Sequence, residues 1–212
     1  MVVESDVTAI VLCGGRSSRM GRDKAAIEFE GATLLQRTVD AVGAVAGEMI
    51  LVRAPGQVLP AITTVLPMTT VEDAIAGEGP LFGMATGLGA ATGEWCLIVG
   101  VDMPFLQPSL LGLLVERLGA AHAASGARWV VPVAGGRPQP LCSAITRDAL
   151  PVLRTHLEAG DRAPMAVAAD LRLVRIDELD WRSADPRGLS FVDVDTPAAL
   201  DAALRLSDKP RE

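Results

Sequence analysis

The stretch VTAIVLCGG, residues 7–15, predicts a buried strand followed by a tight turn. Its first six residues are mostly apolar and rich in β-branched side chains, and the glycines end the run, which is typical of a strand covered on both faces. Similar runs occur further along the chain: MILV (49–52), CLIVGV (96–101), WVVPV (129–133), LRLVRI (171–176) and FVDV (191–194). We expect each of them to form a strand of one sheet.

The segments between these runs carry apolar residues at the spacing of amphipathic helices. Three such stripes are Leu35, Val39, Val42 and Ala46; Leu81, Met84, Ala85 and Leu88; and Leu110, Leu111, Leu114, Val115 and Leu118. A further helix is expected in DTPAALDAAL, with Thr196 as its N-cap and Pro197 at its first position. This alternation predicts an α/β fold with a mostly parallel sheet between two helical layers. We expect a single domain over residues 1–206 and a flexible polar tail at 207–212.

The composition disfavours nucleic acid as a partner. Half of the 212 residues are hydrophobic and 21% are charged, as in globular proteins, whereas aromatic residues make up only 3% and tyrosine is absent. Few rings are therefore available for stacking on bases. The net charge of −7 further disfavours affinity for a phosphate backbone.

The cysteines and the N-terminus indicate a cytoplasmic protein. Cys13, Cys96 and Cys142 are far apart and form no CxxC pair, so we expect reduced thiols and no zinc site. The acidic start MVVESD differs from a signal peptide, and no apolar stretch reaches 18 residues. We therefore expect neither secretion nor a membrane partner.

Three unusual segments are placed directly at the ends of predicted strands. They are CGGRSSRMGRDK (13–24), DMPFL (102–106) and DVDTP (193–197). In open α/β sheets, ligands bind beyond the carboxyl ends of the strands, where chain reversals leave a crevice. The functional site is therefore expected at this edge of the sheet.

The first of these segments combines bare backbone with positive charge. It fits neither the P-loop pattern nor GxGxxG. Gly14 and Gly15 would let backbone N–H groups approach phosphate oxygens. Four cationic residues share the segment: Arg16, Arg19, Arg22 and Lys24. The alternative is a strand-to-helix turn with solvated charges, but this density of cations favours a small, phosphate-rich ligand.

Asp102 directly follows the predicted strand CLIVGV, and Pro104 prevents that strand from continuing. An acidic residue at such a strand end is either a helix cap or a metal ligand. A triphosphate usually travels with Mg²⁺, which prefers one or two carboxylates together with phosphate oxygens and water. We therefore expect Asp102 to be a magnesium ligand.

Six segments taken together resemble the molybdenum cofactor guanylyltransferase family over about the whole chain. They are LCGGRSSRMGRDK (12–24), GEGPLFGMATGL (77–88), VDMPFL (101–106), GRPQPL (136–141), LEAGDR (157–162) and FVDVDTP (191–197). The opening loop and the DMP segment alone indicate only the broader nucleotidyltransferase superfamily. GRPQPL and LEAGDR narrow the resemblance to the family.

The resemblance implies a Rossmann-like, three-layer α/β/α domain of the nucleotide-diphospho-sugar transferase type. It also implies a Mg²⁺-dependent reaction in which GTP and a molybdopterin-type cofactor give a guanine dinucleotide cofactor and pyrophosphate. The attacking group would be a phosphate oxygen of the cofactor, so no side-chain nucleophile is required. The expected partners are GTP, the cofactor and, in transient contact, enzymes that deliver or accept it.

The resemblance further implies roles for individual residues. The nucleotide site would comprise Leu12, Cys13, Gly14, Gly15, Lys24, Arg53, Asp73 and Asp102. Lys24 would contact phosphates, and Arg53 and Asp73 would lie near the base and ribose. Asp102 would bind the metal, and Arg19 together with Lys24 would stabilise the departing pyrophosphate.

Some positions depart from the family pattern. Cys13 stands where Ala is usual, so we expect its thiol to face the nucleotide loop as a passive small group, and Arg53 stands where Asn is common. Asp193 and Asp195 occupy positions that help to hold the pterin in relatives, but they could instead lie near the metal or cap the last helix. Arg137, in an expected hairpin turn between WVVPV and LCSAI, would contact the cofactor substrate.

Other functions remain open at this point. A cytidylyltransferase for the same cofactor and a sugar-phosphate nucleotidyltransferase share the opening loop. A nucleotide-binding regulatory protein without catalysis is also consistent with that loop, although Asp102 favours an enzyme. We expect His122 and His156, which lie in helix-like stretches, to have packing or surface roles rather than catalytic ones.

Overall fold

The computed structural model describes residues 6–14, 23–73 and 78–207. Its main feature is a sheet with the strand order β10-β7-β9-β6-β1-β4-β5, and β8 pairs with β7 off this path. The strands are β1 (Val7–Leu12), β4 (Glu48–Arg53), β5 (Met68–Glu72), β6 (Trp95–Gly100), β7 (Trp129–Ala134), β8 (Arg137–Pro138), β9 (Cys142–Thr146) and β10 (Val174–Ile176).

The centre of the sheet is parallel. Ile10 of β1 lies between Ile50 of β4 and Ile98 of β6, and both pairings are parallel. β4 also pairs in parallel with β5, and β7 with β10, whereas β9 runs antiparallel to its neighbours β6 and β7. The chain passes from β1 outward to β4 and β5 and then returns to β6 on the other side of β1. The strand order thus reverses between β1 and β6, the kind of position where such sheets bind ligands.

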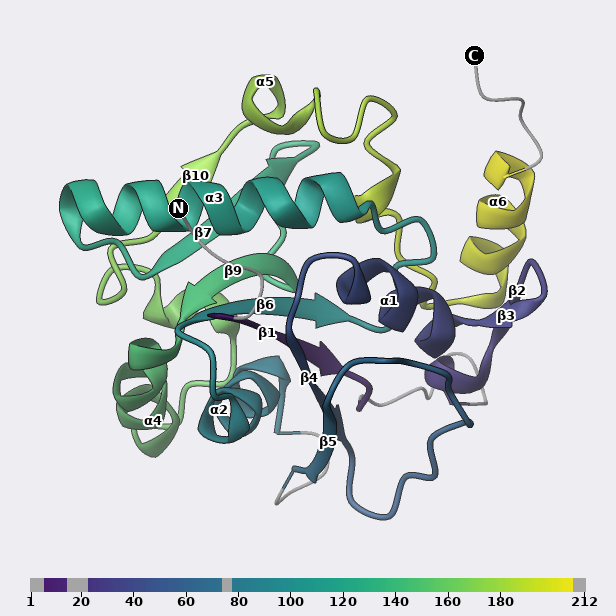
Figure 1. Cartoon of the computed structure of the whole chain (residues 1–212), viewed down its shortest axis with the longest axis horizontal. Coiled ribbons are helices and arrows are strands. Elements are labelled where there is room, and N and C mark those ends of the chain that lie inside the picture. Colours follow the sequence, from purple (N-terminus) through teal and green to yellow (C-terminus); the bar gives the residue numbers. More distant parts are fainter. Residues whose placement is uncertain (1–5, 15–22, 74–77, 208–212) are drawn as a thin grey trace.

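Helices cover both faces of the sheet. The helices that do so are α1 (Leu34–Gly43), α2 (Pro80–Ala90), α3 (Pro108–Ser125) and α4 (Leu150–Glu158), and the described residues also form α5 (Glu178–Trp181) and α6 (Pro197–Ser207). Figure 1 shows α1 and α3 on one side of the strands and α2 and α4 on the other. The expected three-layer α/β/α arrangement is therefore confirmed.

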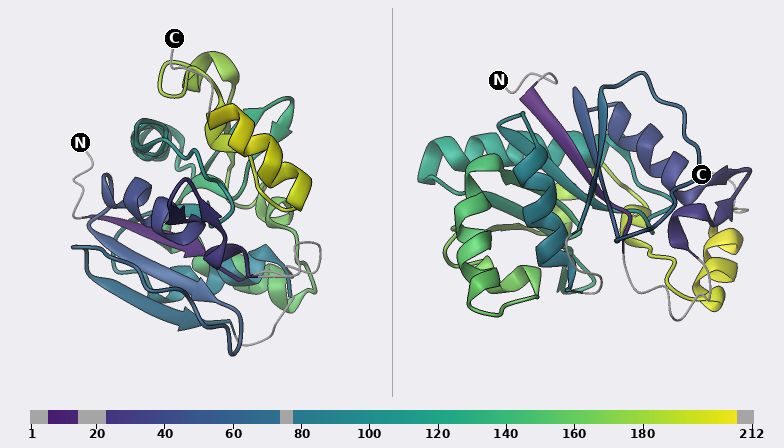
Figure 2. Two further views of the ribbon diagram at one scale, coloured as in Figure 1. Left: turned by 90° about the vertical axis from the view of Figure 1, so that its right-hand side faces the viewer. Right: turned by 90° about the horizontal axis from the view of Figure 1, so that it is seen from below.

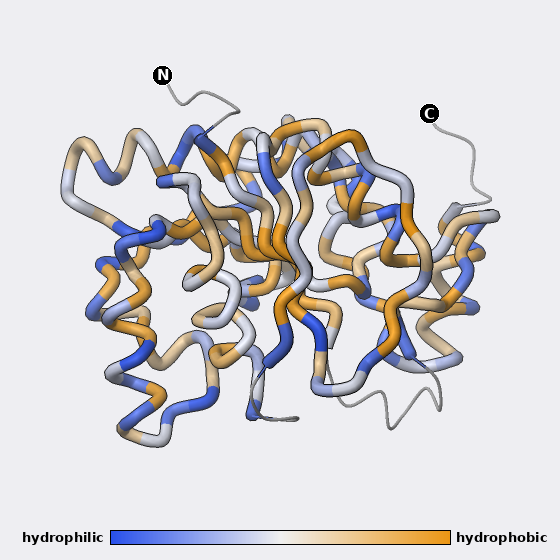
Figure 3. The backbone as a smooth tube through the Cα atoms, turned by 60° about the horizontal axis from the view of Figure 1, so that its bottom comes forward, coloured by the Kyte–Doolittle hydropathy of each residue, from blue (hydrophilic) through white to orange (hydrophobic). Residues whose placement is uncertain are grey.

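Two clusters of buried apolar side chains lie between these layers, one on each face of the sheet. Alternate residues of β1 point to opposite faces: Ala9 and Val11 belong to the cluster under α1 and α3, and Ile10 belongs to the cluster under α2 and α4. Figure 3 shows the hydrophobic residues concentrated in the central strands. Burial on both faces explains why these strands appear in the sequence as continuous apolar runs.

A third, smaller cluster lies at one end of the molecule. Its buried members are Ile27, Phe29, Leu34, Val194 and Ala203. They join α6 to the hairpin of β2 (Glu28–Phe29) and β3 (Ala32–Thr33), which lie close together in Figures 1 and 2. Thr196 Oγ1 accepts a hydrogen bond from Ala199 N at 3.1 Å, and α6 begins at Pro197, as the sequence predicts. The last helix is thus anchored to residues from the first part of the chain.

One strand prediction is wrong and a second is only partly confirmed. FVDV (191–194) forms no strand, because Phe191 ends a short 3-10 helix (Leu189–Phe191) and the following residues run past the edge of the sheet, with Val194 buried in the third cluster. In LRLVRI (171–176) only Val174–Ile176 is a strand, since Arg172 adopts a left-handed conformation with φ of 49°. The exposed edge strand β5 was not predicted at all.

Three further sequence predictions concern the hairpin, the C-terminal tail and the membrane. The expected hairpin is present, since β8 runs antiparallel to β7 beyond the glycine turn. Of the expected tail at 207–212, Ser207 is the last residue of α6 and the remainder lies outside the described residues. No helix in the described ranges is long and apolar enough to cross a membrane.

Candidate functional site

The carboxyl ends of β1, β4, β5 and β6 meet at one edge of the sheet. Cys13 N and Gly14 N both donate to Val52 O, at 2.8 and 3.3 Å, and Asp73 N donates to Arg53 O at 2.9 Å. On the other side of β1, Val101 N donates to Leu12 O at 3.2 Å. The predicted residues Leu12, Cys13, Gly14, Arg53, Asp73 and Asp102 therefore come from adjoining strand ends.

Gly14 allows the end of β1 to lie against the end of β4. A Cβ atom at this position would come within 2.9 Å of Ala54 N, closer than real side chains approach backbone. Gly14 itself is exposed. The glycine therefore has a packing reason here, besides leaving its backbone open to a ligand.

Lys24 and Asp102 form an ion pair at this edge. Lys24 Nζ lies 2.8 Å from Asp102 Oδ2, and the two side chains are 21% and 22% exposed. Lys24 begins a short 3-10 helix (Lys24–Ala26), whose N-cap Asp23 accepts a hydrogen bond from Ala25 N through Oδ1 at 2.9 Å. The arrangement brings a cation that can bind phosphate next to a carboxylate that can bind a metal ion.

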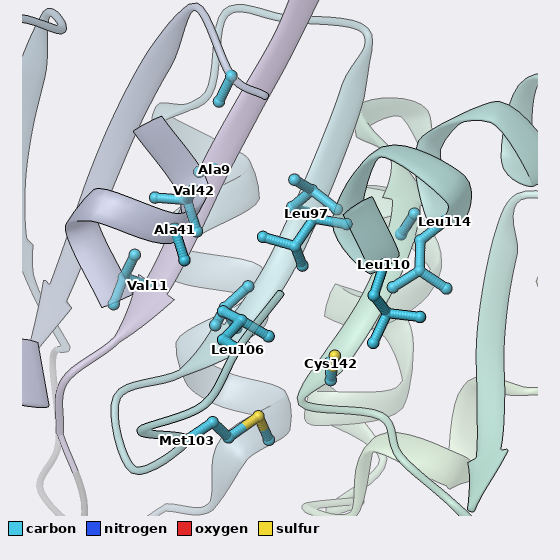
Figure 4. Close-up of a cluster of buried hydrophobic side chains, with 14 of the residues drawn as sticks. Ala9, Val11, Ala41, Val42, Leu97, Met103, Leu106, Leu110, Leu114 and Cys142 are labelled. Carbon is cyan, nitrogen blue, oxygen red and sulfur yellow. The ribbon is translucent and has the colours of Figure 1, made fainter. Parts of the chain in front are cut away.

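The loop that carries Asp102 is held by two buried apolar side chains and by a backbone hydrogen bond. Met103 and Leu106 point into the cluster under α1 and α3, as Figure 4 shows. Asp102 O accepts a hydrogen bond from Val194 N at 2.8 Å, so the segment before α6 fastens the loop. Asp102 does not cap α3, because that helix begins at Pro108 with Gln107 at its N-cap position.

Two buried polar atoms on the other side of β1 lack a hydrogen-bond partner within the described residues. They are Arg53 Nε and Asp73 Oδ1. The rest of the Arg53 guanidinium is engaged: Nη2 lies 3.0 Å from Glu72 Oε2, and Nη1 donates to Gln57 O at 2.9 Å. Burial raises the pKa of the Asp73 carboxyl, while a hydrogen bond from Thr86 acts in the opposite direction. An unpaired donor and an unpaired acceptor thus lie at neighbouring strand ends.

Gln57 is a site residue that the sequence analysis missed. Its side-chain Nε2 donates to Cys13 O at 3.1 Å and to Asp23 Oδ2 at 2.8 Å. Its Oε1 accepts a hydrogen bond from Ala54 N at 2.9 Å. A signal was present in the sequence APGQ (54–57), which is typical of a type II turn that brings its last residue back to the strand end.

The thiol of Cys13 points into the hydrophobic core, whereas the sequence analysis expected it to face the nucleotide loop, most of which lies outside the described residues. The side chain is buried in the cluster under α1 and α3, and Sγ lies 3.6 Å from Val11 O. Alternation along β1 turns the side chain of residue 13 to the same face as Val11. Burial raises the pKa of the thiol to about 12, with a smaller effect of Asp23 in the same direction. Only the backbone of Cys13 faces Gln57.

Some of the remaining predicted residues lie outside the described ranges, and the others can be located. Gly15, Arg16, Arg19 and Arg22 lie outside the described residues. Asp193 and Asp195 flank Val194 and therefore lie next to the backbone of Asp102. Arg137 is exposed on β8, at the carboxyl end of β7.

The two histidines have structural partners in place of catalytic ones. His122 Nδ1 lies 3.0 Å from Ala127 O, and the ring packs edge-to-face on Trp95. His156 lies between Asp161 and Asp170, with nitrogen–oxygen distances of 2.7 and 2.8 Å. Both contacts agree with the packing and surface roles expected for them.

Comparisons with known proteins identify a family for this chain. The family model described as MobA-like NTP transferase domain matches residues 9–175. A protein of Desulfosudis oleivorans named "Molybdenum cofactor guanylyltransferase" is 31% identical over 198 residues, covering 93% of this chain and 94% of the relative. A protein of Methanosarcina mazei named "Probable molybdenum cofactor guanylyltransferase" is 32% identical over 205 residues, covering 92% and 88%.

Solved structures show the same fold. The molybdopterin-guanine dinucleotide biosynthesis protein A of Archaeoglobus fulgidus matches with a TM-score of 0.75 at 21% identity, covering 96% of this chain and 100% of that chain. The 2-C-methyl-D-erythritol 4-phosphate cytidylyltransferase of Thermus thermophilus matches with a TM-score of 0.69 at 18% identity, covering 98% and 100%. The Rossmann-like fold is therefore shared with nucleotidyltransferases of more than one substrate class.

Proposed function

The chain belongs to the MobA-like NTP transferase family, and we propose that it transfers GMP from GTP to a molybdopterin-type cofactor and releases pyrophosphate. The observation that carries this proposal within the molecule is the Lys24–Asp102 pair at the point where the strand order reverses. A regulatory protein that only binds nucleotides has less need of a carboxylate at that point. The names of the relatives from Desulfosudis oleivorans and Methanosarcina mazei support the guanylyl group and the cofactor.

The reaction requires little covalent work from the protein. A phosphate oxygen of the cofactor forms a bond to the α-phosphorus of GTP, and the bond from that phosphorus to the bridging oxygen of pyrophosphate breaks. Lys24 would leave Asp102 and stabilise the charge that develops on the departing pyrophosphate. Arg19, which lies outside the described residues, would assist it. The protein contributes mainly by holding both substrates at adjoining strand ends.

Asp102 would hold a Mg²⁺ ion in this scheme. The described residues contain no group of three or more His, Cys, Asp or Glu side chains that could bind a metal on their own. Mg²⁺ suits such a site, because it keeps several waters and often takes only one or two carboxylates in addition to phosphate oxygens. When bound, the ion would neutralise phosphate charge. The single, partly exposed carboxylate of Asp102 fits that role.

The base and ribose would lie against β4 and β5. Arg53 Nε can donate a hydrogen bond and Asp73 Oδ1 can accept one, and neither has a partner within the described residues. Guanine and ribose present both acceptors and donors, and a site built for such groups rejects analogues that leave its polar atoms unpaired. We propose that these two atoms contribute to nucleotide selection.

The cellular setting is also a proposal. The three cysteines are free and buried, which suits a reducing cytoplasm. Transient contact with enzymes that deliver or accept the cofactor would complete the cycle.

Pyrophosphate release tests the function directly. The protein is incubated with Mg²⁺, the pterin cofactor and GTP, CTP, ATP or UTP in separate reactions, with cofactor-free reactions as controls. We expect release with GTP that depends on the cofactor. Release with CTP alone would make the protein a cytidylyltransferase, and no release with any of the four nucleotides would refute the proposed transfer.

A further inference from the structure

Gln57 links residues on the two sides of the β1 carboxyl end through polar contacts, and the crevice that we expect a nucleotide to occupy would lie there. It ends the turn Ala54–Gln57, in which Gln57 N donates to Ala54 O at 3.0 Å. Pro55 and Gly56, with a φ of +69° at the glycine, occupy the two central positions as a type II turn requires. The turn therefore places the Gln57 side chain back over the end of β1.

The side-chain amide is used on both its donor and its acceptor side. Its nitrogen serves two acceptors, Cys13 O and Asp23 Oδ2, while its oxygen serves Ala54 N. A primary amide is the side-chain group that offers two N–H donors together with a carbonyl acceptor. Replacement by a carboxylate of the same shape would keep the acceptor and lose both donors.

These contacts lead from Gln57 to the catalytic pair. Asp23 receives Gln57 on Oδ2 and caps the 3-10 helix of Lys24 through Oδ1. Lys24 in turn reaches Asp102 from that helix. A lysine has a long side chain with many rotamers, so its point of attachment decides where its ammonium group can be held. The backbone carbonyl of Gln57 meanwhile accepts from Arg53 Nη1.

We infer that Gln57 is a positioning residue. Its side-chain amide holds Asp23, and through it Lys24, on the side where the phosphates would lie. Its backbone carbonyl holds Arg53 on the side where the base would lie. The catalytic part of this inference rests on the proposed nucleotidyl transfer. The positional part does not, because it concerns where the Lys24 amine lies in the protein without substrates.

The isosteric variant Gln57→Glu tests the inference, because it places a carboxylate against Asp23 and the Cys13 carbonyl. We expect kcat to fall roughly tenfold while KM for GTP changes much less, since misplacing a group that acts on the leaving pyrophosphate affects the transition state most. Adding Asp23→Asn should restore part of the loss. The asparagine amide can donate to the introduced carboxylate while its oxygen still accepts from Ala25 N.

The chain offers a matched control in Gln36 on α1. Its Nε2 donates to Asp40 Oδ1 at 2.7 Å and to Thr63 O at 2.9 Å, and its Oε1 accepts from Thr63 N at 2.8 Å. The amide therefore makes the same three kinds of hydrogen bond as Gln57, but with none of the strand-end residues of the crevice. Gln36→Glu should leave kcat unchanged.

A second readout needs no activity. The sequence contains two lysines, Lys24 and Lys209, so acylation by an amine reagent can be followed for each by peptide mass spectrometry. The ion pair with Asp102 should slow labelling of Lys24. Gln57→Glu should speed it by roughly fivefold relative to Lys209, the scale of one lost hydrogen bond, and the double variant should slow it again.

The two readouts separate the two hypotheses. If the wild-type protein transfers no nucleotide, the proposed function fails, but the labelling of Lys24 still decides the positional role. Unchanged Lys24 labelling in Gln57→Glu would overturn the inference whatever the activity. Equal loss of kcat in Gln57→Glu and Gln36→Glu would overturn it as well, because the effect would not be specific to the crevice.

Discussion

The polar groups at the amino ends and at the carboxyl ends of the same parallel strands differ in their hydrogen-bond pairing. At the amino ends of β1 and β4, Glu48 Oε2 accepts from Thr8 Oγ1 at 2.7 Å, from Thr92 Oγ1 at 2.8 Å and from Thr92 N at 3.1 Å. Thr8 Oγ1 also accepts from Gly93 N at 3.0 Å. At the carboxyl ends, Arg53 Nε and Asp73 Oδ1 are buried without partners among the described residues.

Under the proposed function, this difference separates polar groups that serve the fold from polar groups that would serve a ligand. A buried polar atom without a partner costs free energy, so protein interiors rarely contain one. The network at Glu48 is closed by the protein itself and contributes to the stability of the fold. The carboxyl edge instead retains a charged pair and two atoms without a partner among the described residues, which the proposed nucleotide would satisfy.

The largest expected effect tests the carboxyl edge. Asp102→Asn removes a charge while the amide oxygen can still accept from Lys24, so the free energy of unfolding should change by less than about 1 kcal/mol. Transfer activity should fall roughly 10²–10³-fold, the scale for one electrostatic group acting on a transition state. Pyrophosphate release and urea denaturation measure the two quantities. Retained turnover would show that the carboxyl ends of the strands do not carry the functional carboxylate that the comparison assigns to them.

A smaller effect of the opposite kind is expected at the amino edge. Glu48→Ala leaves Thr8 and Thr92 without their shared acceptor and should lower the free energy of unfolding by about 2 kcal/mol. The kcat of the folded protein should stay that of the wild type, because the site lies at the other end of the strands. A shift of the urea midpoint without a change in kcat would sharpen the comparison, whereas a loss of kcat would break it.

The smallest effect is a pH dependence away from both edges. Hydrogen bonds to Asp170 and then Asp161 raise the pKa of His156 above its ordinary value of 6.5. A raised pKa means that the folded state holds the proton more tightly, so this stabilisation is complete below about pH 6.5 and is lost as pH rises through the raised value. The Asp161 side chain is 45% exposed and the Asp170 side chain is 65% exposed, so we expect this stabilisation to be less than about 1 kcal/mol.

Thermal unfolding at pH 6 and pH 8 measures this contribution. The wild-type protein should lose slightly more stability over that interval than a His156→Asn variant. An identical pH dependence in both proteins would mean that the exposed aspartates do not hold the histidine in solution, in contrast to the hydrogen bonds that join Glu48 to the buried Thr8.

Sequence patterns predicted the central strands because those are buried on both faces and leave continuous apolar runs. β5 was missed because it is an edge strand whose residues are mostly exposed, so MTTVE (68–72) shows no such run. FVDV was assigned as a strand on two valines, yet one of them packs under α6 and the segment pairs with the loop of Asp102 instead of a strand. Apolar pattern alone does not distinguish these two destinations.

The candidate site was predictable to a similar degree. Lys24 and Asp102 belong to charged motifs after apolar strands, and the structure brings them together. Gln57 carries no charge and no motif, and its role arises only because a turn returns it to the end of β1. The side-chain direction of Cys13 could have been predicted, because residues 11 and 13 of an extended strand point to the same face. The sequence analysis instead assigned Cys13 to the loop that follows β1.

The hydrogen bond from Val194 N to Asp102 O has a consequence for the synthesis of the protein. The loop of Asp102 leaves the ribosome well before the backbone that fastens it, because Val194 lies far downstream in the chain. A nascent chain can complete the central strands and still lack this hydrogen bond until α6 has docked on the β2–β3 hairpin. Truncations that remove α6 would therefore act on the loop of Asp102 itself, and this loop should become ordered later than the sheet.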